Sequence, residues 1–363
     1  MNGELLKKRF TQKSTFYNAL MVIAIIGFVL IKIPYLNLPF FWDEAWVYGP
    51  AIFTMEESGP CLLPGCISQW LHTGHPLLFY FSASLWMKIF GATCFSGHVF
   101  SLFISIITII SFYLIGSKVF TKKIGLLSSL LLMTTPIFMA QSGILVPEMF
   151  LTFFTLWALY FYIKKKYILY FIAAVCAVYT KESGVVVICA VALHSLIFNK
   201  NYPKLIKRFI VSLGLFSPIL IGSIFYILQY YISGFFFFPR HLNWVDLSIP
   251  SIWGKFNSEL FFIALAQGRK VISFIALFSL IIIIMNRNKK IITIEERRNL
   301  YLLLIFLFGF FTFCSINFLS TRYMLSMVPV FFLISTLFIL KALDVKKWTF
   351  LPLVLILLTI NLL

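Results

Sequence analysis

The chain is a succession of apolar segments separated by short polar breaks. Eleven segments have the length and composition of membrane helices, at 17–36, 98–117, 124–140, 149–163, 167–181, 184–198, 209–232, 262–285, 299–319, 323–341 and 348–363. A helix needs about 20 apolar residues to cross the hydrocarbon core of a bilayer. The pattern therefore predicts an all-α integral membrane protein, a polytopic bundle of about 11 transmembrane helices that form one domain, 1–363.

A further apolar stretch, 76–90, has only 15 residues, and the distribution of charge decides where it lies. If this stretch does not span, 22 of the 30 lysines and arginines fall on one side of the membrane. They form the clusters Lys7–Lys13, Lys118–Lys123, Lys164–Lys166, Lys200–Arg208, Arg287–Arg298 and Lys341–Lys347. Basic residues gather on the cytoplasmic side, so we expect a cytoplasmic N-terminus. Segment 76–90 is then an interfacial helix within a long first external loop, 37–97, and 233–261 is a second external loop.

Composition and charge agree with this interpretation. Hydrophobic residues make up 61% of the chain and charged residues 12%, which excludes a soluble domain. The net charge of +18 lies in short clusters between apolar segments, which indicates membrane topology and argues against nucleic acid as a partner. The first segment has a basic front but no small-residue cleavage site, so we expect an uncleaved helix. Eight of the twelve acids fall on the external side, where we therefore expect chemistry.

Two adjacent acids, Asp43 and Glu44, follow Phe40, Phe41 and Trp42 at the external end of the first helix. A carboxylate held among aromatic rings at the membrane surface can act as a general base. Burial there would raise its pKa, whereas a cationic partner would lower it. The structural alternative is a pair of interfacial acids that end a helix. We favour the functional interpretation.

Two more external segments carry candidate groups. His75, in "LHTGHPLLFYF", could bind a phosphate or a sugar hydroxyl, and Glu148, in "VPEMF", could either face the same cavity or only complement a helix dipole. His72 and His75 lie near Cys61 and Cys66, but this spacing is not a usual zinc pattern. We predict no metal site, although a divalent cation could take part in the reaction. A Cys61–Cys66 disulfide would form if the external side is oxidising.

The external cations are suited to a lipid phosphate. Lys181 and Glu182 lie together in "YTKES", and Arg322 and Tyr323 lie in "STRYML". An arginine recognises phosphate with two parallel hydrogen bonds. Arg240, beside His241 in the second external loop, could contact the phosphate or cover the site. The alternatives are a mutual Lys181–Glu182 ion pair, an arginine that reaches to the interface, and a solvated loop.

Five motifs now occur in a recognisable order, "FWDEAW", "GHPLLFYF", "VPEMF", "YTKES" and "TRYMLSMVP". This order resembles the GT-C membrane glycosyltransferases, in particular the protein O-mannosyltransferase and aminoarabinose transferase-like proteins. The resemblance is best over 38–190 and 318–332. It implies transfer of a sugar from a polyprenyl-phosphate donor to a lipid, glycan or protein acceptor at the external face of a bacterial or archaeal plasma membrane.

The same resemblance assigns roles to residues. It implies that Asp43 is the catalytic base, accompanied by Glu44, and that Lys181, Arg322 and Tyr323 hold the donor phosphate. The family usually has two prolines after the histidine, and Leu77 replaces the second of them here. Longer members carry a soluble C-terminal domain, which is not expected in this sequence. A rival hypothesis is a flippase or transporter of lipid-linked sugars, but such a protein should place polar groups near the membrane midplane.

Overall fold

The apolar segments fold into helices of unequal length. In this computed structural model the described residues are 2–198, 204–286 and 291–346, with 357, 359 and 361, and they form helices and no strands. The α-helices are α1 Asn2–Lys32, α2 Gly49–Ser58, α3 Gln69–His72, α4 Leu78–Phe90, α5 Cys94–Val119, α6 Lys122–Thr134, α7 Pro136–Gln141, α8 Pro147–Ile163, α9 Tyr167–Thr180, α10 Val185–Phe198, α11 Leu205–Phe216, α12 Pro218–Ser233, α13 Pro239–Leu242, α14 Ile249–Leu260, α15 Arg269–Met285, α16 Ile294–Ile316 and α17 Met327–Lys346. Short 3-10 turns, Ile33–Tyr35, Glu182–Gly184 and Thr321–Ser326, and π turns, Glu44–Tyr48 and Phe261–Leu265, join some of them.

Four helical segments of the described chain are long and apolar enough to cross a membrane, Thr15–Tyr35, Cys94–Val119, Ile294–Ile316 and Thr321–Asp344. Two further pairs of helices are each bent at a short break, α11 with α12 and the helix 249–265 with α15. If each pair counts as one span, the number of spans is six. The integral membrane, all-α prediction is therefore confirmed, but the count of eleven spans is not. The segment predicted at 348–363 lies almost wholly outside the described residues.

Proline and short length explain the difference in count. The predicted span 124–140 is broken after Thr135, because Pro136 starts the new helix α7. The predicted span 209–232 bends by 44° where Pro218 opens α12. Helices α8, α9 and α10 have the predicted bounds to within two residues, but they contain only 17, 14 and 14 residues. These three helices are shorter than the membrane is thick.

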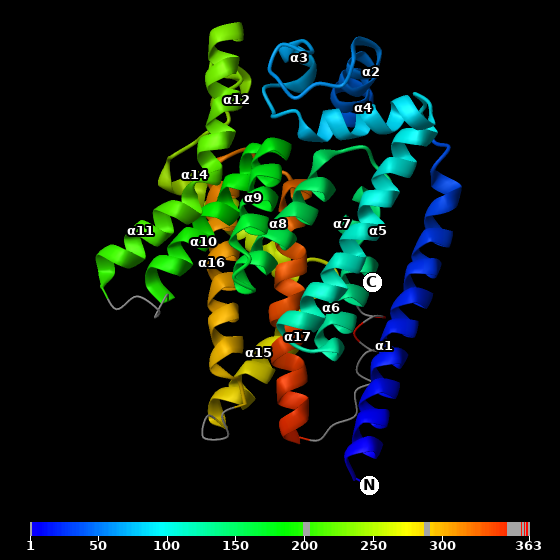
Figure 1. Cartoon of the computed structure of the whole chain (residues 1–363), viewed down its shortest axis with the longest axis vertical. Coiled ribbons are helices and arrows are strands. Elements are labelled where there is room, and N and C mark those ends of the chain that lie inside the picture. Colours follow the sequence, from blue (N-terminus) through cyan, green and yellow to red (C-terminus); the bar gives the residue numbers. More distant parts are fainter. Residues whose placement is uncertain are drawn as a thin grey trace.

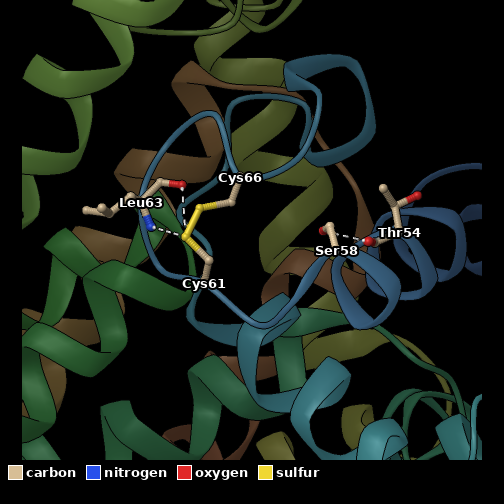
Figure 2. Close-up of a disulfide and its surroundings, with 5 residues drawn as sticks. All are labelled: Thr54, Ser58, Cys61, Leu63 and Cys66. Atoms are coloured by element: carbon tan, nitrogen blue, oxygen red, sulfur yellow. Dashed lines mark hydrogen bonds between the residues drawn. A yellow bond between two sulfur atoms is a disulfide. The ribbon is translucent and has the colours of Figure 1, made fainter.

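The first loop folds over one end of the bundle. The 13-residue helix α4 is too short to span, as predicted, and Figure 1 shows it lying across the top of the helices with α2 and α3 above it. Between α2 and α3 the structure joins Cys61 and Cys66 in a disulfide (Figure 2). The backbone N–H of Leu63 donates to Cys61 Sγ over 3.4 Å within this turn. The loop thus forms a folded cover at the end of the bundle where α1 terminates.

Small residues let the central helices approach closely. A Cβ added to Gly125 of α6 would lie 2.4 Å from Ser117 Oγ and 2.7 Å from the Tyr113 carbonyl oxygen, both in α5. Helix α17 crosses the same helix, and Ser128 and Thr336 share a hydrogen bond of 2.6 Å. Membrane helices associate through this kind of close backbone contact and polar pairing. Helices α5, α6 and α17 therefore form a rigid frame beside helices α8, α9 and α10.

An arginine stabilises the sharpest bend. The helix 249–265 meets α15 at 84°, and Arg269 at the bend is fully buried. Its Nε and Nη2 atoms donate to the Phe262 carbonyl oxygen over 3.1 and 2.7 Å, and Nη1 donates to Gln267 Oε1 over 3.0 Å. The guanidinium thus satisfies a carbonyl that the broken helix leaves without an amide partner.

We expect Arg269→Ala to destabilise the protein, because it leaves the Phe262 carbonyl unpaired and opens a cavity. The expected loss is about 3–5 kcal/mol in equilibrium unfolding in mixed micelles. Lys270→Ala is the matched control, since Lys270 is the exposed neighbour. Equal melting of the two variants would contradict this role for Arg269.

Candidate active site

Four segments distant in the sequence bring acids and bases together under the first loop. Asp43 stands directly before the π turn Glu44–Tyr48, and Glu148 lies in the first turn of α8. Lys181 ends α9, and Arg322 and Tyr323 lie in the 3-10 turn before α17. We call these five residues the acid–base cluster. All five were candidates from the sequence.

The charges of the cluster alternate from the surface inward. Asp43 Oδ2 forms an ion pair with Arg322 Nη1, and Arg322 Nε lies 3.6 Å from Glu148 Oε1. The same Glu148 oxygen is 2.9 Å from Lys181 Nζ. The Asp43 side chain is 25% exposed, that of Arg322 14%, and those of Glu148 and Lys181 only 2% and 5%. The acid nearest the surface is therefore Asp43, while Glu148 is a buried counter-ion for both cations.

Aromatic rings enclose the two cations. The Arg322 guanidinium lies 4.9 Å from the Tyr323 ring, 5.3 Å from the Trp42 ring and 5.9 Å from the Tyr48 ring. Lys181 Nζ lies 3.6 Å from the Tyr323 ring centre. Arg322 Nη2 also donates to the Tyr323 hydroxyl over 3.1 Å. Rings that exclude water strengthen every charge interaction in the cluster.

A second polar group lies beside the cluster. His75 Nδ1 is 2.7 Å from Glu182 Oε2, and the His241 ring lies 5.0 Å from the His75 ring. Burial, helped by the neighbouring His75, lowers the pKa of His241 to about 4. Burial and His75 likewise lower the pKa of His72 to about 4, and His72 Nδ1 lies 3.1 Å from the His75 carbonyl oxygen. Both rings are therefore neutral at pH 7, and of these three histidines His75 is the one paired with an acid.

Lys181 and Tyr323 of the cluster and the His75–Glu182 pair line the polar end of a cavity of about 430 Å³, and Arg322 adjoins it through its hydrogen bond to Tyr323. Its polar lining includes His75, Lys181, Glu182, His241 and Tyr323. The rest of its wall is mainly apolar and comes from α12, the second external loop and the end of α16, including Ile219, Tyr226, Phe237, Phe238, Phe310 and Phe313. A cavity of this kind can hold a charged headgroup at one end and a hydrocarbon chain along the other.

Glu44 points away from the cluster, although the sequence paired it with Asp43 as catalytic. Its side chain is 3% exposed, and Oε1 accepts from the Leu145 backbone N–H and lies 3.2 Å from His98 Nε2. Oε2 accepts from the Phe41 N–H over 3.2 Å. Glu44 therefore ties the segment that carries Asp43 to α5 and to the turn before α8. The signal for this role was His98, a lone polar ring in an apolar helix.

Arg240 is exposed, and within the described residues the structure does not bring it to the cluster. Its neighbour His241 lines the cavity instead. Sequence reasoning also missed Trp42 and Tyr48 as walls for Arg322, because aromatic residues are common throughout this chain. The described residues contain no group of three or more His, Cys, Asp or Glu that could hold a metal ion.

Comparison with known proteins concerns the fold. Residues 74–227 match the family described as dolichyl-phosphate-mannose-protein mannosyltransferase. The structure superposes on ArnT from Cupriavidus metallidurans bound to undecaprenyl phosphate with a TM-score of 0.62 and 17% identity, over 92% of this chain and 60% of that one. The fold is that of the GT-C membrane glycosyltransferases. The resemblance predicted from the sequence is thereby confirmed.

Two other proteins are similar. The Archaeoglobus fulgidus oligosaccharyltransferase, solved in complex with Zn and sulfate, matches with a TM-score of 0.56 and 14% identity, over 94% of this chain and 53% of that one. An uncharacterised protein of Aquifex aeolicus (strain VF5) is 28% identical over 220 residues, which is 56% of this chain and 44% of that protein. The chain thus spans about half the length of the relatives it matches.

The buried ion pair gives a stability prediction. Lys181→Met leaves Glu148 with only the more distant Arg322, and Glu148→Gln leaves Lys181 without its acid. Each single substitution should lower the free energy of unfolding by about 3–5 kcal/mol. The double variant should lower it by less than the sum of the two, because it leaves no uncompensated charge on this pair. Unfolding in mixed micelles measures this cycle, with exposed Lys88→Met as control. Additive losses would show that the two side chains are not coupled.

Proposed function

We propose that this protein is a glycosyltransferase that moves a sugar from a polyprenyl-phosphate donor to a hydroxyl of a lipid, glycan or protein acceptor. One observation carries the proposal: Lys181 lines the polar end of a cavity with apolar walls, and Arg322 and the partly exposed Asp43 are joined to it through a chain of ion pairs. The cations are placed for a phosphate, the walls for an isoprenoid chain and the acid for a proton. The undecaprenyl phosphate bound to ArnT supports the choice of lipid.

The proposed reaction is a single displacement. The acceptor O–H attacks the anomeric carbon from the face opposite the phosphate, the new C–O bond forms, and the bond from this carbon to the phosphate oxygen breaks. Asp43 takes the proton of the hydroxyl, and the phosphate leaves with the electron pair. Arg322 and Lys181 stabilise the charge that develops on the phosphate. A single displacement inverts the configuration of the anomeric carbon.

The ion pair between Asp43 and Arg322 has a role in this scheme. The guanidinium engages Oδ2 of Asp43, one of the two oxygens that could take the proton of the acceptor hydroxyl. A donor phosphate is a second anion that competes for the same guanidinium. Donor binding would therefore release Asp43 for the acceptor, and base catalysis would become available only when a donor is present.

The buried residues keep the cations in place. Glu148 stands within 3.6 Å of Arg322 and 2.9 Å of Lys181, so the empty cavity does not hold two unpaired cations. His75 and Glu182 lie on the cavity wall and are placed to bind hydroxyls of the sugar. Glu44 positions Asp43 through its contacts with Leu145 and His98.

The topology of the proposal follows from charge. Among the described residues, Lys165, Arg297 and Arg298 lie at the ends of α8 and α16 that are opposite the acid–base cluster. We therefore place the N-terminus in the cytoplasm and the active site on the external face of a bacterial or archaeal plasma membrane. The sugar, the acceptor and the length of the carrier are for experiment to find. The rival function, a flippase of lipid-linked sugars, is an outcome of the test below.

The first test is turnover of labelled polyprenyl-phosphate sugars by purified protein in lipid nanodiscs. Asp43→Asn keeps a hydrogen-bonding partner for Arg322 but removes the base, so we expect folding to be unchanged and the rate to fall by about 10²–10⁴-fold. Glu57→Gln, an exposed acid of the same loop, is the control and should keep the wild-type rate.

Full turnover by Asp43→Asn would exclude Asp43 as the base. Transbilayer movement of the donor without any sugar release by the wild type would instead favour the flippase.

A second test concerns donor binding. Arg322→Lys keeps the charge but loses the forked pair of donors, so we expect the dissociation constant for polyprenyl phosphate to rise by at least about 10-fold. Asp43→Asn should bind polyprenyl phosphate at least as tightly as the wild type, because a neutral amide competes with the phosphate for Arg322 less strongly than a carboxylate does. Weaker binding by Asp43→Asn would contradict the proposed competition for the guanidinium.

A further inference from the structure

A second cavity, of about 540 Å³, lies at the other ends of the helices that hold the candidate active site. It is formed by the turn between α8 and α9, the end of α10 and the first two turns of α16. Asn299 of α16 lines this cavity and Cys314 of the same helix lines the first one. Fifteen helical residues span about 22 Å, so the two cavities are separate sites.

Three cations line this second cavity, Lys165, Arg297 and Arg298. Among the residues that the structure describes, none of the three forms an ion pair. The buried acid nearest in sequence, Glu296, is already paired with Lys341 over 2.8 Å. The positive-inside pattern explains cations at this end, but it does not require them to converge on one cavity.

The cavity floor contains a buried donor that has no acceptor. Asn299 is 2% exposed, and its Nδ2 has no hydrogen-bond partner among the described residues. Two polar side chains of the same wall are satisfied: the Tyr162 hydroxyl lies 2.8 Å from His194 Nδ1, and His194 Nε2 lies 3.1 Å from the Arg298 carbonyl oxygen. These contacts link α8, α10 and α16. An unused buried donor in a rigid wall indicates a missing acceptor ligand.

The backbone at Lys165 gives a further indication. Lys165 has φ +56° and closes α8 in a Schellman turn, in which the Lys166 N–H donates to the Phe161 carbonyl oxygen over 2.8 Å. Glycine is the usual residue at this position because it has no Cβ. A lysine there adopts a less favourable conformation and places its cation at the cavity.

We propose that this second cavity binds the phosphate headgroup of an anionic phospholipid. Three cations and the Asn299 amide supply donors for phosphate oxygens. Aromatic residues Tyr162, Tyr167, Phe198 and Tyr301 form its walls, as expected at the level of lipid headgroups. Exposed Ile168 and Ile197 lie on the same ends of α9 and α10, at 79% and 49% exposure. An acyl chain can lie against these residues, which favours a lipid over a soluble phosphate.

The test compares phosphatidylglycerol with phosphatidylcholine on delipidated protein, by native mass spectrometry and by the shift in melting temperature. The cavity variant is Lys165→Gln with Arg297→Gln and Arg298→Gln. The control removes three exposed cations elsewhere, Lys118→Gln with Lys204→Gln and Lys207→Gln. One cation near a membrane surface changes the affinity for an anionic lipid by about 5-fold. The cavity variant lacks three cations, so it should bind phosphatidylglycerol on the order of 100-fold more weakly. The control should change binding by less than about 5-fold.

Two further measurements make the result specific. Asn299→Leu keeps all charges but removes the buried donor, so it should weaken phosphatidylglycerol binding by about 5–10-fold, as loss of a hydrogen bond to a charged group does. This variant and single Arg298→Gln decide the question if the triple variant fails to fold. Inorganic phosphate at millimolar concentration should not displace the lipid.

Three outcomes would overturn the proposal. Equal losses in the cavity and control variants would mean that binding follows overall charge. Equal affinity for the two lipids would exclude an anionic headgroup site. Displacement of phosphatidylglycerol by inorganic phosphate would assign the cavity to a soluble phosphate. None of these outcomes depends on whether the protein transfers sugars.

Discussion

The buried carboxylate of Glu148 is the interaction on which the candidate site depends. Without it, two cations would share a poorly hydrated space beneath the first loop, and like charges in such a space repel strongly. One Glu148 oxygen faces both Lys181 and Arg322, and the other has no hydrogen-bond partner among the described residues. With Asp43, which pairs with Arg322, the two cations and the two acids balance. The site can therefore remain folded without a ligand, and an incoming anion has to compete with these acids for the cations.

Asp43 and Glu44 are adjacent in the sequence, but their side chains have different partners and different roles. The π turn that begins at Glu44 directs consecutive side chains to different partners. Glu44 is held by backbone amides and by His98, so the position of the segment is fixed before any ligand binds. Asp43 is left partly exposed, with Arg322 as its ion-pair partner. The rigidly held Glu44 thus fixes the position of Asp43. A base at a water-exposed surface needs such a fixed position.

The sequence was sufficient for the helical class, for the non-spanning segment 76–90 and for most members of the cluster, because these follow from apolar length, charge asymmetry and the order of motifs. It was not sufficient for the breaks at Pro136, Pro218 and Arg269. Prolines occur inside membrane helices as well as between them, so the hydropathy pattern alone does not place a bend. The role of Glu44 depends on its tertiary contacts with Leu145 and with His98 of α5, and local sequence does not encode these contacts.

The unequal helix lengths explain why both cavities lie where they do. Helices α8, α9 and α10 contain 17, 14 and 14 residues, which corresponds to about 25, 21 and 21 Å at 1.5 Å per residue. A hydrocarbon core is about 30 Å thick, so these helices end below the level reached by α5 or α16. Their ends form recesses, and the polar residues that terminate them, Glu148 and Lys181 at one end and Lys165 at the other, lie in these recesses. Short helices inside a frame of long ones therefore create sheltered polar sites at both ends of the bundle, where a lipid headgroup can enter from the side while its chain remains in the membrane.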